Sequence, residues 1–403
     1  MPRTLYVRDV AAVLNPSLGV VRRCTLAALD GRCRVLAPDD TGSLGPGAIV
    51  DGIGLVAVPG LLDAHVHWGA AARERWTSAP PSPEEMGGEY AAFLPKERQQ
   101  CLDCGVTAVV DLGDALDWIL GMRAAAAGGL PGPRVYAVGP LFTAPGGHPA
   151  GTHYRGNEWL IAQACRQFSP DQEAAAARAV GELASRGVDA IKVVYESGGG
   201  TLPRLDEGVL AVVIAAAHRH GLLVHAHVGT CAEALAALER GADVIEHVPA
   251  PEGPDGWERV GAALASCQAA ICPTLVAAAP HVSQSVLHQM AQWVHRLAIA
   301  GVRVHVGTDL GNPGVLPGTS VHDEMALLAQ GGMSAGQALA AATAWPADTL
   351  SGTAVGQIAD GAYADWLLVG RDPLRDIQTL RTPSLVIQGG RVVAGSEQGE
   401  RAE

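Results

Sequence analysis

The chain has 403 residues, of which 48% are hydrophobic and 17% charged, and its formal net charge is −13. This composition is typical of a folded protein with a large core and excludes an intrinsically disordered chain. The acidic balance, without any cluster of Lys or Arg, argues against a nucleic-acid partner or an anionic membrane surface. No apolar stretch reaches the length of about 18 residues that a membrane-spanning helix needs. The eight cysteines are dispersed along the chain, so we expect reduced thiols in a cytoplasmic protein.

Both ends of the chain predict short β-strands. Near the start, apolar runs separated by Gly and Asp cover residues 4–15, 20–37 and 47–58. Near the end, similar runs cover residues 364–370 and 384–395. Such runs with turn residues between them are typical of β-structure. We therefore expect one small β-sandwich domain built from both termini, residues 1–58 and 351–403.

The middle of the chain, residues 59–350, predicts an α/β domain in which buried strands alternate with helices. Alanine-rich segments with helical periodicity separate the strands, and Gly187 and Gly221 mark the ends of two helices. Eight such units predict a (β/α)8 TIM barrel. A doubly wound sheet is the alternative, but no GxGxxG motif follows the first strand. The eight predicted strands cover residues 61–67, 106–112, 133–139, 189–195, 222–228, 243–248, 269–275 and 302–309, with the longest insertions around 68–95 and 140–169.

Polar side chains gather where the predicted barrel strands end, which is the face that carries function in this fold. They follow the first, fourth, fifth, sixth and eighth strands. A His-x-His pair in a strand places both imidazoles on one face, because side chains alternate with period two. Two imidazoles on one face can bind one metal ion. Burying so many polar groups in an apolar core costs free energy, so their presence there indicates a functional site. The residues concerned are His65, His67, Lys192, His225, His227, His247 and Asp309.

Lys192 is unusual because the chain contains only two lysines, Lys96 and Lys192, among its 28 Lys and Arg residues. Burial in a strand lowers the pKa of a lysine and favours the neutral, nucleophilic amine. Such an amine can add carbon dioxide to give a carbamate, whose two oxygens can bridge two cations. A salt bridge to a neighbouring carboxylate is the alternative. Asp309 could ligate a metal and accept a proton, or it could cap the segment that follows.

Several motifs of the chain resemble those of the amidohydrolase superfamily. The resemblance extends in order over nearly the whole chain, including the closing segments ATAWPADTLSG and GQIADGAYADWLLVGRDPLRDI. Within the superfamily the chain is most similar to the prolidase and ochratoxinase branch, to which imidazolonepropionases are related. The motifs that carry the resemblance are VPGLLDAHVH, PGGHP, IKVVY, LLVHAHV, ADVIEHV, ICPTL and VGTD.

The resemblance implies a binuclear metal site. His65, His67 and Asp309 would hold the more buried metal, His225 and His247 the more exposed one, and carboxylated Lys192 would bridge them. His225 and His227 lie on the same strand face, so geometry alone does not choose between them; the resemblance favours His225 as the ligand and leaves His227 near the substrate. His148 would contact the scissile carbonyl or a substrate carboxylate, unless it is a loop histidine without a special role. The further residues expected in the substrate pocket are His153, Tyr154 and Arg155.

These expectations combine into a metal-dependent hydrolase of an amide- or peptide-type C–N bond in a small molecule, such as a dipeptide or an N-acyl amino acid. A hydroxide that bridges two Zn²⁺ ions would attack, and Asp309 would serve as base and then as acid. Imidazole ligands suit zinc better than magnesium or calcium. The alternatives are a lactone, carbamate or organophosphate ester hydrolase on the same site and, more remotely, a non-catalytic scaffold protein. Relatives in this branch often form multimers, so we expect a homo-oligomer.

Overall fold

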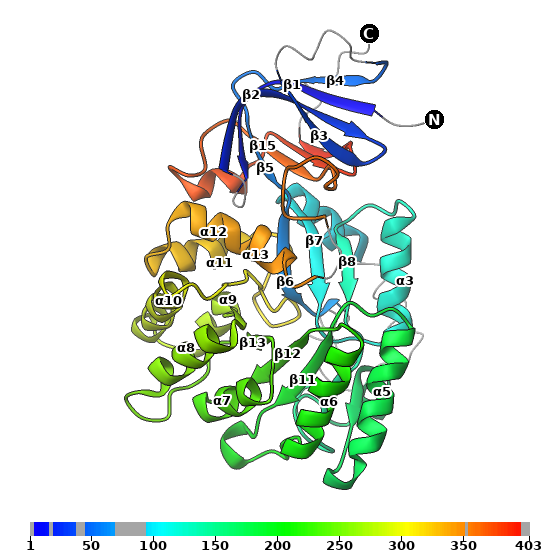
Figure 1. The fold of residues 1–403 in the computed structure, drawn as a ribbon, viewed down its shortest axis with the longest axis vertical. Helices are drawn as coiled ribbons and strands as arrows, with labels where there is room; N and C mark the ends of the chain where they lie inside the picture. Colours follow the sequence, from blue (N-terminus) through cyan, green and yellow to red (C-terminus); the bar gives the residue numbers. More distant parts are fainter. Residues whose placement is uncertain (1–3, 16–18, 38–44, 69–93, 351–353, 396–403) are drawn as a thin grey trace.

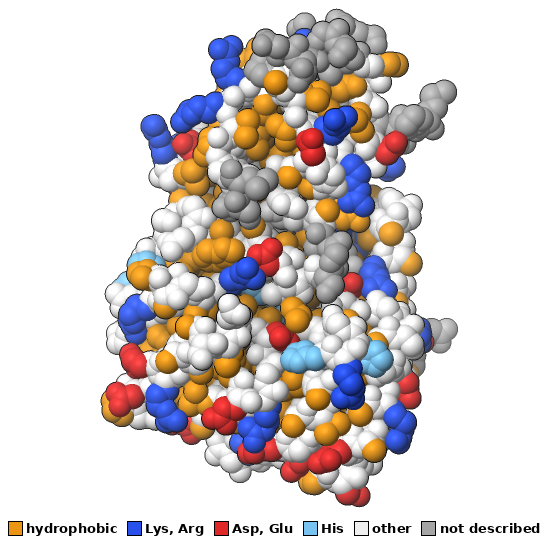
Figure 2. Space-filling model, viewed as in Figure 1, with side chains coloured by type: hydrophobic (Ala, Val, Ile, Leu, Met, Phe, Trp, Pro, Cys, Tyr) orange, Lys and Arg blue, Asp and Glu red, His pale blue; other side chains and the backbone are white. Residues whose placement is uncertain are grey.

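The computed structural model describes residues 4–15, 19–37, 45–68, 94–350 and 354–395, so most of the insertion predicted around residues 68–95 lies outside the described residues. The strands from the two ends of the chain form one region, shown in blue and red at the top of Figure 1, and the α/β region lies below it. In the described residues no helix is long and apolar enough to cross a membrane. On the face drawn in Figure 2, Lys and Arg side chains are dispersed among carboxylates.

The terminal region is a single eight-stranded sheet to which both ends of the chain contribute. Its order is β17-β16-β15-β5-β1-β2-β3, and β4 pairs with β1. Strand β5 joins the two halves, because it pairs in parallel with β1 and antiparallel with β15. The strands are β1 (Thr4–Asn15), β2 (Gly19–Leu29), β3 (Arg32–Leu36), β4 (Ala48–Asp51), β5 (Val56–Pro59), β15 (Trp366–Val369), β16 (Leu385–Gln388) and β17 (Arg391–Gly395).

The α/β region contains two parallel sheets. One has the order β6-β7-β8 and the other the order β10-β9-β11-β12-β13-β14. Nearly every residue of the longer strands is buried, as expected for parallel strands covered on both faces. The strands are β6 (Leu61–Val66), β7 (Val106–Asp111), β8 (Arg134–Ala137), β9 (Leu141–Thr143), β10 (Cys165–Gln167), β11 (Ile191–Tyr195), β12 (Val224–Val228), β13 (Val244–Glu246) and β14 (Ala270–Cys272).

Helices follow the parallel strands, and some of them begin at residues whose side chains cap the first turn. The side chain of Asp206 accepts hydrogen bonds from the first turn of α6, and Thr230 forms a capping box with Glu233 at α7. The α-helices are α3 (Leu116–Ala127), α4 (Glu158–Ala164), α5 (Glu173–Ser185), α6 (Glu207–Arg219), α7 (Cys231–Glu239), α8 (Gly256–Cys267), α9 (Leu275–Ala278), α10 (Gln284–Ile299), α11 (Thr319–Gln330), α12 (Ala335–Ala341) and α13 (Ala344–Ala347); short 3₁₀ helices cover Pro170–Gln172, Gly198–Gly200, Ala279–His281 and Ile377–Arg381.

The eighth predicted strand, residues 302–309, differs from the expectation. It forms isolated bridges, Val304 to Ile271 and Leu310 to Val66, instead of a continuous strand. It nevertheless lies between β14 and β6, because the backbone N–H of His305 donates to Ile271 and that of Ala64 to Val306. This order of parallel segments is consistent with a barrel.

The two regions are joined by a short connection and by a partly buried ion pair between Arg134 and Asp365. Strand β6 starts directly after β5, and the N–H of Gly60 donates to the carbonyl of Asp365 at 2.8 Å. The side chain of Asp365 in turn accepts two hydrogen bonds from Arg134, at 2.8 and 3.1 Å. This bidentate contact fixes the terminal sheet against the start of β8.

Candidate metal centre

Strand pairing brings the predicted polar residues together in one place. Lys192 lies opposite His225 in the pairing of β11 with β12, and His227 lies opposite Glu246 in the pairing of β12 with β13. Residues opposite each other in parallel strands point to the same face. Lys192, His225 and Glu246 are almost completely buried, with exposures of 2%, 2% and 0%. The inner face of these strands therefore carries a dense group of polar side chains.

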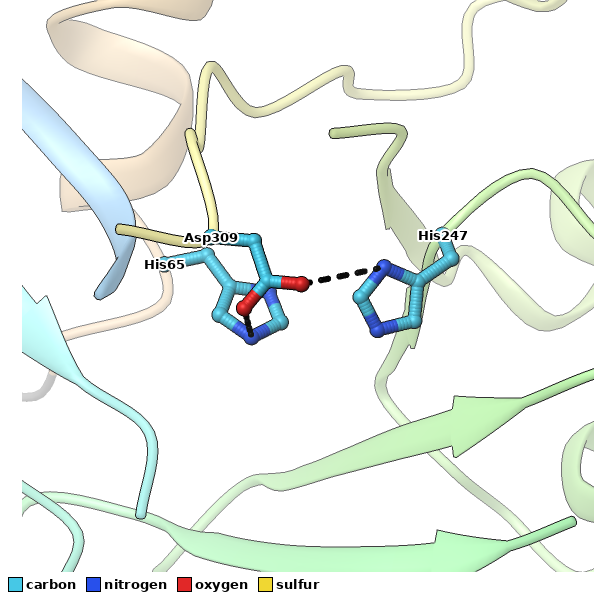
Figure 3. A group of neighbouring side chains, drawn as sticks. All are labelled: His65, His247 and Asp309. Carbon is cyan, nitrogen blue, oxygen red and sulfur yellow. Dashed lines mark ion pairs between the residues drawn. The ribbon is translucent and has the colours of Figure 1, made fainter. Parts of the chain in front are cut away.

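His65, His67 and Asp309 meet at the end of β6. The Nε2 atoms of His65 and His67 lie 3.2 Å apart, and each lies 3.5 Å from Oδ1 of Asp309. The carboxylate of Asp309 also faces His247, with 4.0 Å between its Oδ2 and the Nδ1 of that ring, so that it lies between two imidazoles (Figure 3). The ligand atoms of His65, His247 and Asp309 all lie within 4.8 Å of one another.

The backbone is strained where these side chains leave their strands. His247, Thr274 and Asp309 have φ angles of 71°, 48° and 58°, in the left-handed region that costs a non-glycine residue about 1–3 kcal/mol. Hydrogen bonds hold two of these turns, since the N–H of His247 donates to Cys272 and that of Asp309 to His65. The turn at His247 lets two consecutive residues, Glu246 and His247, both reach the same group of side chains.

Two buried nitrogen atoms in this group have no hydrogen-bond partner in the described parts of the chain, Nζ of Lys192 and Nε2 of His225. A buried polar atom without a partner costs about 1–3 kcal/mol. Lys192 lines the same pocket as His67, His247 and Asp309, and the carboxylate of Asp309 lies 3.5–4.0 Å from the rings of His65, His67 and His247, longer than hydrogen bonds. Imidazole nitrogens and a carboxylate are suited to bind a cation, and carboxylation of the Lys192 amine would add two oxygen donors, so the residues present fit the metal centre that the sequence predicts.

Glu246 is a residue that the sequence analysis did not identify. Its Oε2 lies 2.6 Å from Nδ1 of His65, and its Oε1 lies 2.6 Å from Nδ1 of His225. One carboxylate thus bonds an imidazole from each of two strands. The sequence contained two signals for this residue. Side chains alternate along β13, which places Glu246 on the same face as Val244, and Glu246 directly precedes the predicted ligand His247 at the end of the strand.

The environment sets the charges of these groups. Burial lowers the pKa of His65 and of His247, and lowers the pKa of His67 to about 3. The imidazoles are therefore neutral near pH 7, which is the form that binds metals. Burial alone would raise the pKa of Asp309, but His65, His247, His67 and Lys192 together hold it below the ordinary value. Burial lowers the pKa of Lys192, which favours the free amine.

The ring of His227 contacts that of His247, with centroids 4.6 Å apart, and it lines the pocket described below, which His225 does not. Nε2 of His227 lies 2.7 Å from Oε2 of Glu196, and its ring stacks on that of His148 with centroids 4.8 Å apart. The ligand atoms of His148, Glu196 and His227 lie within 4.8 Å of one another. Nδ1 of His148 is 2.8 Å from the hydroxyl of Thr152. Burial, and then His227, lower the pKa of His148 to about 3. Glu196 is a second residue that the sequence analysis did not identify.

A pocket of about 710 Å³ opens above the buried group. Of the three residues expected in the substrate pocket, His153 and Tyr154 lie in its lining, whereas Arg155 is exposed and lies outside it. Much of the wall is apolar, including Leu141, Val194, Val248 and Met290. The polar side chains that reach it are His67, His148, Thr152, Lys192, Glu196, His227, His247, Thr274, His281, Asp309 and Asn312. The pocket is large enough for a small organic molecule.

Two comparisons of the sequence with known proteins give matches over most of the chain. A family model described as "Amidohydrolase family" matches residues 56–393. Ochratoxinase from Aspergillus niger is 27% identical to the chain over 390 residues, which cover 86% of this chain and 78% of that protein.

Solved structures with the same overall fold include three named hydrolases. Aspergillus niger ochratoxinase superposes with a TM-score of 0.80 at 21% identity, covering 98% of this chain and 96% of that one. A Xaa-Pro dipeptidase with bound methionine gives 0.78 at 22% identity and covers 97% and 100%. Molinate hydrolase gives 0.78 at 22% identity and covers 97% and 94%. At these identities the structural likeness shows the fold alone.

Proposed function

The chain belongs to the amidohydrolase family and is a hydrolase, and on this basis we propose that it cleaves an amide- or peptide-type C–N bond at a centre of two divalent cations. His65, His67 and Asp309 would hold the more buried cation, and His225 and His247 the more exposed one. Lys192, carboxylated by carbon dioxide, would bridge them. We also propose that the parallel strands close into a (β/α)8 barrel around this centre.

One observation supports the proposal: a buried lysine amine without a hydrogen-bond partner in the described residues shares a pocket with the imidazoles of His67 and His247 and the carboxylate of Asp309. An unpaired amine in this position destabilises the fold, so a chemical role is the simplest reason for its presence. Carboxylation would convert it into an anion with two oxygen donors. The same reasoning supports His225 over His227 as a ligand, because Nε2 of His225 is buried and free, whereas Nε2 of His227 bonds Glu196.

The donor set favours zinc. Four imidazoles, a carboxylate and a carbamate oxygen are nitrogen and oxygen donors of the kind that Zn²⁺ binds, whereas Mg²⁺ and Ca²⁺ prefer oxygen alone. When bound, the cations would supply Lewis-acid polarisation of the scissile carbonyl and would lower the pKa of a water molecule. No other part of the described site supplies comparable positive charge.

The residues of the chain would perform the remaining steps. Asp309 is held as a carboxylate by its neighbours, so it would accept the proton of the attacking water and deliver it to the leaving nitrogen. His148 and His227, stacked in the pocket wall, would donate hydrogen bonds to the scissile carbonyl or to a substrate carboxylate. Glu196 fixes the ring of His227 through its hydrogen bond. The apolar wall would exclude water from the acyl part of the substrate.

The substrate class is proposed from the pocket and from the relatives together. The pocket combines an apolar wall with two imidazoles, which suits a dipeptide or an N-acyl amino acid. Of the aromatic residues in the insertion around 140–169, Tyr154 lines the pocket, whereas Phe168 packs on Phe142 at 5.7 Å between centroids and Trp159 is 40% exposed. One of the related structures is a dipeptidase that cleaves before proline by its name.

The test compares turnover of dipeptides, N-acyl amino acids, lactones, carbamates and aryl phosphate esters by zinc-loaded and chelated protein. We expect turnover of amides only after zinc loading, and a 10²- to 10⁴-fold lower kcat in Asp309→Asn. Asp323→Asn is the matched control, since Asp323 is 42% exposed on α11 and bonds Arg381. Unchanged turnover after chelation would contradict the metal centre, and turnover of esters alone would favour the alternative ester or lactone hydrolase.

A further inference from the structure

We propose that Glu246 is a positioning residue that orients one imidazole ligand of each cation at once and thereby couples the two metal positions. This inference rests on the proposed function, because it concerns how the chain prepares the centre for its metals. The sequence analysis did not identify this residue as part of the site. The observation behind it is the bridge that one carboxylate forms between two histidines from different strands.

The geometry of the bridge is well defined. Glu246 is 0% exposed, and His65 and His225 are 1% and 2% exposed. Both distances from a carboxylate oxygen to Nδ1 are 2.6 Å, which is short for a hydrogen bond to nitrogen and typical of a charged acceptor. The contact joins residues 181 positions apart in one case and 21 in the other. Both imidazole rings are therefore held at Nδ1 by one buried carboxylate.

The chemical consequence follows from the tautomers of histidine. A carboxylate is only an acceptor, so each Nδ1 that faces it must carry the proton. Each Nε2 then presents a lone pair, which is what a metal ligand needs. Nε2 of His65 lies near His67 and Asp309, while Nε2 of His225 is buried without a partner. Glu246 thus prepares a donor atom for the more buried cation and another for the more exposed one.

Replacement by glutamine separates this role from simple packing. Glutamine has the shape of glutamate but offers one acceptor oxygen and one NH₂ donor. The oxygen can serve one histidine, whereas the NH₂ group faces the Nδ1 of the other. That second histidine must then accept at Nδ1 and protonate Nε2, which removes its metal lone pair. A residue that only filled space would tolerate the change.

The experiment measures zinc binding directly. Metal-free wild type, Glu246→Gln and Asp365→Asn are dialysed against chelator-buffered zinc, and bound zinc is quantified by atomic absorption. We expect two equivalents in the wild type and a 10- to 100-fold weaker affinity for at least one of them in Glu246→Gln. Asp365→Asn also changes a buried carboxylate, one that bonds Arg134 at the junction with the terminal sheet, and it is expected to bind zinc like the wild type.

The outcomes separate this inference from the function on which it rests. Two equivalents bound by Glu246→Gln within threefold of the wild-type affinity would overturn the positioning role and leave the metal centre intact. A wild-type protein that binds no zinc would overturn the proposed function itself. If Glu246→Gln does not fold, ¹⁵N NMR of the metal-free wild type decides the question. We then expect Nδ1–H tautomers for the signals that disappear in His65→Gln and His225→Gln, and Nε2–H tautomers would refute the inference.

Discussion

Replacing Lys192 with methionine tests whether the buried amine lowers the stability of the metal-free fold while serving the proposed metal centre. Lys192 is 2% exposed, and its Nζ has no hydrogen-bond partner among the described residues. Methionine has a similar length and no polar head, so it would fill the same space without leaving a cavity. We therefore expect the metal-free Lys192→Met protein to be more stable than the metal-free wild type, although the proposed bridging ligand is lost.

The magnitude follows from the cost of the unpaired amine. Burying a polar group without a partner costs about 1–3 kcal/mol in proteins. A chain of 403 residues has an unfolding entropy of about 0.8 kcal/mol per kelvin near its midpoint, so Tm should rise by about 1–4 °C. Zinc at 1,000 times its Kd would stabilise the wild type by about 4 kcal/mol. The variant should lose most of that gain.

The pH dependence has a definite sign. Burial lowers the pKa of Lys192 in the folded state, while the unfolded value is about 10.4. Between these two values the unfolded chain binds more protons, so the stability of the wild type falls as the pH falls through this window. The advantage of Lys192→Met should therefore be largest at the lower end of the window and smallest above pH ~10.4.

The assay is thermal unfolding of metal-free protein with and without added zinc, at several pH values. Lys96→Met is the matched control, because Lys96 is the other lysine of the chain and is exposed; we expect it to change stability by less than about 0.5 kcal/mol. A metal-free Lys192→Met protein that melts below the wild type at every pH would refute the reasoning. That result would instead indicate the alternative in which Lys192 forms a stabilising salt bridge.

Three further predictions address the ligands, the metals and a buried acid. His225→Ala should lose zinc, measured by atomic absorption, whereas His227→Ala should keep zinc and lose kcat/KM; the reverse pattern would exchange their roles. Chelation should abolish amide hydrolysis and lower Tm, and added zinc should restore both. A chelated protein that keeps its Tm would contradict the proposed metal centre. Burial raises the pKa of Asp63 to about 7, so its contribution to stability is present below pH ~4 and is lost as the pH rises through about 7. Asp63→Asn should reduce the change in the free energy of unfolding with pH between about pH 4 and 7. An unchanged pH dependence would disprove the raised pKa of Asp63.

The strands and the polar side chains at their ends were largely predictable because they depend on local patterns. The strand predicted over residues 4–15 is β1, and the inward-facing residues of β11 and β12 follow from alternation. The eighth strand was not predictable in its detail. There Gly307 passes so close to Cys272 and His65 that a Cβ would lie 2.4 Å from Sγ of Cys272 and 2.7 Å from Cβ of His65. The close approach leaves isolated bridges in place of a regular strand.

The contacts of the candidate site depended on the tertiary structure. In the sequence, His225 and His227 are equivalent, because both point to the same face of one strand. Packing distinguishes them: His225 is covered by β13 and bonds Glu246, while His227 reaches the pocket and bonds Glu196. The assignment of either as a metal ligand stays a prediction.

By itself the sequence determined which chemical groups the protein has at the ends of its strands, since residue identity and period-two alternation are local properties. It also determined that both ends of the chain are β-structure. Only the tertiary structure decided which groups face each other, because pairing and packing join residues far apart in the chain. The bridge from Glu246 to His65, across 181 positions, shows this most directly. No local pattern specifies a contact that exists only when β6, β12 and β13 pack around one interior.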